Sequence, residues 1–134
     1  MCSGAAKVYH SDNMKNKPVL ALVGANAGVL QNGLLSLLLT IPQVKSTMVT
    51  EDVVSVMKLI QAHQPGLVLL DDDLLMVEDA VRQIKSKYPK IKMIVLIKDI
   101  SQQENFTTLG TNAVLVKGFS ARKLIAKIED IMEY

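Results

Sequence analysis

The chain has 134 residues, which is enough for one domain with a hydrophobic core. Its formal net charge of +2 is spread along the sequence without a basic stripe, so nothing supports direct nucleic-acid binding. Cys2 is the only cysteine, which excludes an internal disulfide and fits a reducing, cytoplasmic environment. No secretory signal follows Met1, and the longest apolar stretch, around Leu34 to Ile41, is too short to span a membrane.

Strand-like and helix-like segments alternate along the chain. Residues 1–16 are polar and lack periodicity, so we expect a flexible leader before a domain over residues 17–134. Thr50 is the expected N-cap of the second helix, because acidic residues follow it. The predicted strands cover 19–24, 44–50, 66–71, 93–97 and 113–117, and the predicted helices cover 29–40, 53–63, 77–87, 101–109 and the residues after 120.

Five strand–helix units in strict alternation predict an α/β fold. Strands that are apolar on both faces belong in a parallel sheet with helices on each side. Right-handed crossovers then favour a three-layer α/β/α sandwich around a doubly wound, five-stranded parallel sheet. Periodicity does not give the order of the strands.

Two predicted strands end in a single charged residue. Asp71 closes the run Gly66–Asp71, and Lys117 closes the run Ala113–Lys117. Open α/β sheets place their chemistry at the carboxyl ends of the parallel strands. We therefore expect the Asp71 carboxylate and the Lys117 ammonium to form an ion pair at this edge of the sheet.

These two segments carry a resemblance to a known family. The segments His63–Asp71 and Gly110–Ser120 resemble the third and fifth strands of response-regulator receiver domains, the CheY-like superfamily of two-component signal transduction. The resemblance runs from about Pro18 to Met132. It implies a flavodoxin-like sheet with strand order 2-1-3-4-5, with Asp71 as phosphoacceptor and Lys117 as the residue that senses the phosphoryl group. It also implies a phosphorelay partner, although the departures below leave a cognate histidine kinase uncertain.

Four positions of the expected pocket depart from the pattern of that family. Ala25 and Asn26 stand where an acidic pair normally holds magnesium, Ile97 replaces a hydroxyl residue, and Val114 replaces an aromatic residue. Phosphoryl transfer depends on positioning and on neutralising charge, and magnesium requires carboxylate ligands. The sequence therefore predicts a degenerate receiver, or pseudo-receiver, that needs no cofactor and is not switched by ordinary aspartyl phosphorylation. Magnesium binding is a disfavoured alternative.

The run Asp71-Asp72-Asp73 suggests a metal site, but strand geometry argues against one. Adjacent residues in an extended chain point in opposite directions, so three in a row cannot face one ion. We expect only Asp71 to face the pocket. Asp72 and Asp73 are expected to solvate the loop and to cap the next helix.

The first and last predicted helices carry more apolar residues than the sheet requires. Leu35 and Leu39 are expected to project from the flank of the first helix, and Ile125 and Met132 from the last. Because these helices are neighbours in the implied fold, the four residues would form a surface for a homodimer or another protein partner. The alternative is that the leucines thicken the core.

Three other functions remain open at this point. Asp71 is a working phosphoacceptor in one of them, and in another the chain is the N-terminal receiver of a longer DNA-binding regulator. In the third, the loop Gly24–Gly28 holds a small anion or a nucleotide at a helix N-terminus. The sequence contains no hydrolytic or zinc-binding constellation, so we expect a protein that acts by protein–protein contact and is not an enzyme.

Overall fold

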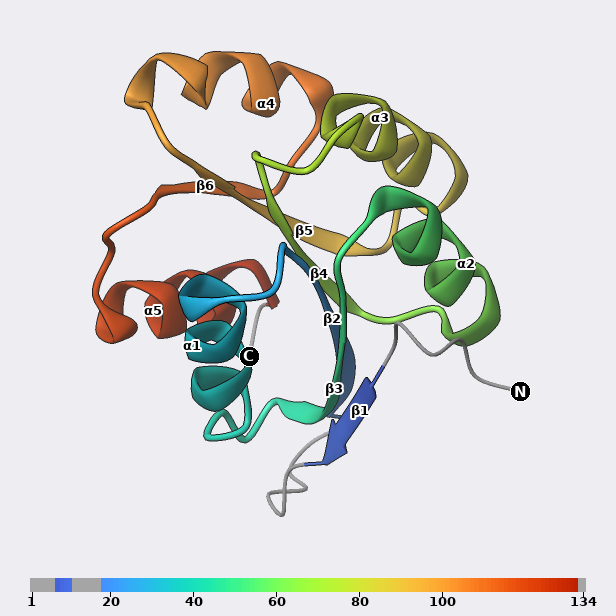
Figure 1. The fold of residues 1–134 in the computed structure, drawn as a ribbon, viewed down its shortest axis with the longest axis vertical. Helices are drawn as coiled ribbons and strands as arrows, with labels where there is room; N and C mark the ends of the chain where they lie inside the picture. The colour runs from blue at the N-terminus through green and yellow to red at the C-terminus, as the bar shows by residue number, and fades with distance from the viewer. Residues whose placement is uncertain (1–6, 11–17, 133–134) are drawn as a thin grey trace.

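The computed structural model describes residues 7–10 and 18–132 as a sheet between two layers of helices (Figure 1). The strands are β1 Lys7–His10, β2 Val19–Gly24, β3 Val44–Thr50, β4 Leu67–Asp71, β5 Lys92–Ile97 and β6 Ala113–Val116. The helices are α1 Val29–Leu38, α2 Val53–His63, α3 Val77–Lys87, the 3-10 turn η1 Ile100–Gln102, α4 Gln103–Leu109 and α5 Ala121–Met132.

The strands lie in the order β1-β3-β2-β4-β5-β6. All neighbours from β3 to β6 are parallel, which confirms the predicted α/β class and the implied order 2-1-3-4-5 for the five parallel strands. Helical crossovers between parallel strands bring every carboxyl end to the same edge of the sheet. That edge carries Asp71 and Lys117.

The edge strand β1 was not predicted. Residues 1–16 were expected to form an irregular leader, but Lys7–His10 pair antiparallel with β3, from Lys7 opposite Val49 to His10 opposite Ser46. Four residues are too few to show a periodicity, and their pairing depends on a strand far along the chain. The rest of the expected leader lies outside the described residues.

The core consists of two apolar clusters, one on each face of the sheet. Alternate residues of each central strand point to opposite faces, as in β4, where Leu67 and Leu69 face α1 and α5 while Val68 and Leu70 face α2, α3 and α4. Figure 1 shows the same division, with α1 beside α5 on one face. Strands buried on both faces explain why the sequence reads as continuous apolar runs.

The start of α2 differs from the prediction. Thr50 is the last residue of β3 and is buried, whereas the N-cap is Asp52, whose side chain accepts a hydrogen bond of 2.7 Å from the Ser55 backbone N–H. An aspartate in an extended conformation is a preferred N-cap.

Within residues 7–10 and 18–132, no helix is both long enough and apolar enough to cross a membrane.

Candidate functional site

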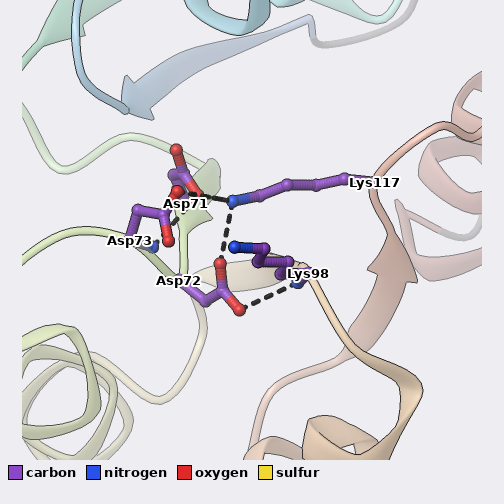
Figure 2. A network of polar contacts seen from close by, with 5 residues as sticks. All are labelled: Asp71, Asp72, Asp73, Lys98 and Lys117. Carbon is purple, nitrogen blue, oxygen red and sulfur yellow. Dashed lines mark hydrogen bonds and ion pairs between the residues drawn. The ribbon is translucent and has the colours of Figure 1, made fainter.

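The candidate site lies where β4, β5 and β6 end. Asp71 is the last residue of β4, and Lys117 directly follows β6. The backbone N–H of Lys117 donates a hydrogen bond of 2.8 Å to the carbonyl oxygen of Ile97, the last residue of β5, so the lysine is fixed to the neighbouring strand. From there its side chain extends to Asp71, and the two form the expected ion pair (Figure 2).

Two further carboxylates contact the same ammonium. The Lys117 Nζ lies 2.9 Å from Asp72 Oδ1 and 3.2 Å from Asp73 Oδ2, in addition to its contact with Asp71. The expectation that Asp72 solvates the loop is therefore wrong, whereas Asp73 is exposed as expected, although its carboxylate also reaches Lys117. In the part of the chain that the structure describes, these three aspartates also form a group whose carboxylate oxygens lie within 4.8 Å of one another.

A tight turn explains why strand geometry failed for this run. The chain leaves β4 at Asp71, where the Leu74 N–H donates to the Asp71 carbonyl oxygen at 3.1 Å. The Asp73 N–H also donates to Asp71 Oδ1 at 3.1 Å. Alternation applies only while the backbone is extended. Nor do these residues cap the next helix, since the N-cap of α3 is Met76, without a side-chain hydrogen bond.

Asp72 connects all three strand ends. Its Oδ1 pairs with Lys117 after β6, and its Oδ2 accepts a hydrogen bond of 2.9 Å from the Lys98 backbone N–H after β5. Its own N–H donates to the Leu96 carbonyl oxygen at 3.0 Å. The Asp72 side chain is 12% exposed, whereas Asp73 is 60% exposed. Asp72 is therefore the more constrained of these two carboxylates.

The electrostatic balance at Lys117 favours its charged form. Partial burial alone would lower the pKa of Lys117, because removal from water penalises the ammonium. Hydrogen bonds to Asp71, Asp72 and Asp73 act in the opposite direction and outweigh burial. The pKa of Lys117 is therefore raised above its ordinary value, and the lysine is fully protonated at neutral pH.

The positions that depart from the receiver pattern offer little to a phosphoryl group. Ala25 is completely buried, and Asn26 is exposed. Ile97 is completely buried, and Val114 packs against the same apolar cluster below α4. Sequence reasoning placed Ile97 in the pocket, but only its carbonyl oxygen takes part in the site. Hydroxyl and carboxylate groups are thus absent from all four positions.

The residues present do not fit the magnesium ion that the fold implies. Magnesium takes six oxygen ligands at about 2.0–2.1 Å in an octahedral arrangement. Here an ammonium already contacts all three carboxylates of the cluster. The loop after β2, which carries the acidic pair in the receiver pattern, here contributes the methyl group of Ala25 and the neutral amide of Asn26. A second cation at this position would meet the positive charge of Lys117 at close range.

An acidic cavity of about 560 Å³ opens beside the ion cluster. Five carboxylates and a single lysine line it, together with apolar side chains such as Leu74 and Phe106. Its charge disfavours the entry of anions such as phosphate. The charged residues of the lining are Asp72, Asp73, Glu78, Asp79, Asp99 and Lys98.

The four residues expected to form an interface are only partly exposed. Leu35, Ile125 and Met132 pack against the core beneath α1 and α5, and Leu39 is also half-buried. Their role as an interface stays a prediction. A separate apolar groove of about 530 Å³ follows α1 toward the loop before α5, and its lining is Val29, Leu30, Gly33, Leu34, Ser36, Leu37, Thr40, Gly118, Phe119 and Ala121.

The comparison with known proteins rests on structure. No protein-family model and no curated protein matches the sequence. The signal receiver domain of the response regulator NarL from Mycobacterium tuberculosis matches with a TM-score of 0.77 at 17% identity, over 88% of this chain and 98% of that one. HP1043, an orphan response regulator of H. pylori, matches with a TM-score of 0.76 at 20% identity, over 88% of this chain and 99% of that one. NtrX from Brucella abortus matches with a TM-score of 0.76 at 22% identity, over 87% of this chain and 26% of that one.

The parallel sheet, its two helical layers and the charged residues at its carboxyl edge define an open α/β sandwich of the flavodoxin-like type. Among such sandwiches, the chain has the fold of response-regulator receiver domains, and the resemblance seen in the sequence is confirmed as a CheY-like fold. At these sequence identities the similarity establishes the fold, and any inference about function must come from the residues of the site.

Proposed function

We propose that this chain is a degenerate receiver that acts in two-component-type signalling in the cytoplasm by protein–protein contact, without catalysis and without magnesium-dependent phosphorylation. The observation that carries the proposal is the shared ammonium of Lys117, which contacts Asp71, Asp72 and Asp73 together. The group that would accept phosphate is thereby already paired with a resident cation.

The charge of the cluster opposes phosphoryl transfer. Three carboxylates and one ammonium give a formal net charge of −2 before any phosphoryl group arrives. Transfer to Asp71 requires the charge on the phosphoryl oxygens to be neutralised, and a metal normally does this. Without that metal, and with apolar Ile97 at the end of β5, transition-state stabilisation is lost, at a factor of ten in rate for each ~1.4 kcal/mol.

The surface of α1 supports the protein-contact part of the proposal. The sequence from Pro18 to Val44 contains no charged residue, and the apolar groove lies along this helix. Val29 is 91% exposed at its start. Exposed apolar surface of this kind is typical of a site for another protein. We propose that a protein partner, or a second copy of the chain, binds here between the first and last helices.

Reaction with acetyl phosphate tests the phosphorylation part. The protein is incubated with acetyl phosphate and magnesium, and its intact mass is measured beside that of Asp71→Ala and of a phosphorylatable receiver. We expect no phosphoryl adduct on this chain while the control receiver is modified. A magnesium-dependent adduct that Asp71→Ala abolishes would instead establish a working phosphoacceptor.

Sedimentation velocity over a range of concentrations tests the contact part. Val29→Glu places a charge at the groove, and Val54→Glu places the same charge on α2, where valine is 64% exposed. If the α1 surface binds a second copy, the wild type and Val54→Glu associate with increasing concentration and Val29→Glu does not. A strictly monomeric wild type would count against self-association and leave a different protein as the partner.

A further inference from the structure

The outer edge of the parallel sheet is covered by a short segment of the same chain. In Figure 1, β1 lies beside β3 at the end of the sheet, and β3 provides its main contacts. The pairing covers Ser46–Val49 and is antiparallel. Residues 11–18 connect β1 to β2.

The strand β3 has a second neighbour besides β1. On its other side β3 pairs along its whole length with β2. Its side chains from Ser46 to Thr50 are buried, which fixes the orientation of the strand. Its seven residues include a single charge, Lys45, and four β-branched residues. A long edge strand with few charges is a ready template for pairing with another chain, and proteins usually protect such edges.

We propose that the β3 edge is a self-association surface covered by β1, and that release of β1 allows β3 to pair antiparallel with β3 of a second copy. A two-fold axis perpendicular to the sheet places identical edges antiparallel, which is the arrangement that β1 already adopts on this edge. The result is one continuous sheet through two molecules. This surface is separate from the α1 groove and does not rest on the proposed function.

The charges of β3 are compatible with such a pair. If the pairing is centred on Ser46–Val49, the segment that β1 covers, then Lys45 lies opposite Thr50 of the partner subunit. The two Lys45 positions are then separated by about 17 Å along the strands, at ~3.4 Å per residue. Like charges therefore do not meet, and cross-strand repulsion does not oppose the dimer.

Proline substitution in the full-length chain tests the proposal. Adjacent N–H groups in a strand point to opposite sides, so one of Val8 and Tyr9 donates toward β3. The double variant Val8→Pro/Tyr9→Pro removes both donors and releases β1. Ser3→Pro/Gly4→Pro is the control, with the same two prolines placed before the strand. Sedimentation velocity gives the mass, and hydrogen exchange reports on the β3 amides that face β1, since those that face β2 remain paired.

The expected result is a concentration-dependent dimer of Val8→Pro/Tyr9→Pro, with the β3 amides protected in the dimer and the control unchanged. A monomer with rapidly exchanging β3 amides would overturn the proposal, because the edge would be open and still unable to pair. A monomer with protected amides would overturn it too, since β1 would not be what covers the edge. Aggregates without a defined dimer would refute the two-fold pairing.

Discussion

Replacement of Lys117 by methionine removes the positive charge from the ion cluster while keeping most of the aliphatic side chain. The carboxylates of Asp71 and Asp72 are 7% and 12% exposed, so both would remain largely buried without their cation. Removing one partner of a buried ion pair typically costs about 3–5 kcal/mol. The exposed Asp73 adds at most about 1 kcal/mol. Because Lys117 itself is 21% exposed, we expect a loss near the lower end, about 3 kcal/mol.

Urea unfolding followed by far-UV circular dichroism measures this loss, since the chain contains no tryptophan for fluorescence. With a slope of about 1–3 kcal/mol per M, the midpoint should fall by about 1–3 M. Lys98→Met is the matched control, because Lys98 contacts Asp72 through its backbone N–H and should change stability by less than about 0.5 kcal/mol.

A double-mutant cycle tests the cause of the loss. Asp71→Asn replaces the most buried of the three carboxylates with a neutral amide. In that background, Lys117→Met should lower the free energy of unfolding by about 1–2 kcal/mol less than it does in the wild type. Equal effects of Lys117→Met and Lys98→Met would refute the reasoning. An unchanged cost of Lys117→Met in the Asp71→Asn background would also contradict it, because the charge would then not be the origin of the stability.

Four further predictions concern stability. Gly24→Ala should destabilise the protein by about 1–3 kcal/mol in thermal or urea unfolding, because its Cβ would lie 2.8 Å from Val56 Cγ2; Gly33→Ala in α1 meets no atom within 4 Å and should stabilise by about 0.5–1 kcal/mol. Asp52→Ala should cost about 0.5–2 kcal/mol in the same assay through loss of the α2 N-cap. The pKa of Lys117 is raised in the folded state, so the stability that Lys117 contributes should be complete below pH 10.5 and decline at higher pH. The urea midpoints of the wild type and of Lys117→Met should therefore converge as the pH rises above 10.5. A constant difference between the two midpoints would contradict the raised pKa.

The sequence predicted the fold well because the signals were local. Each central strand is an apolar run with alternate residues on two faces, and each helix has an apolar stripe, so the order of elements followed directly. The cap at Asp52 was missed by two residues, which is the usual uncertainty at a helix boundary. The strand β1 was missed because its stability depends on β3, more than thirty residues away in the sequence.

The candidate site was predicted only in part. Asp71 and Lys117 follow from their places at the ends of strands. The position of Asp72 differs from the prediction because strand alternation ends at Asp71 and Asp72 already lies in a turn. The three consecutive aspartates were the available signal. In a loop, a run of like charges near a lysine from another strand indicates a shared ion pair as readily as a solvated surface.

Asp72 joins the ends of three strands, so we expect these ends to move together as one unit. Its two oxygens and its N–H join the end of β4 to the segments after β5 and β6. If that edge holds one arrangement at all times, modification has no second state to populate.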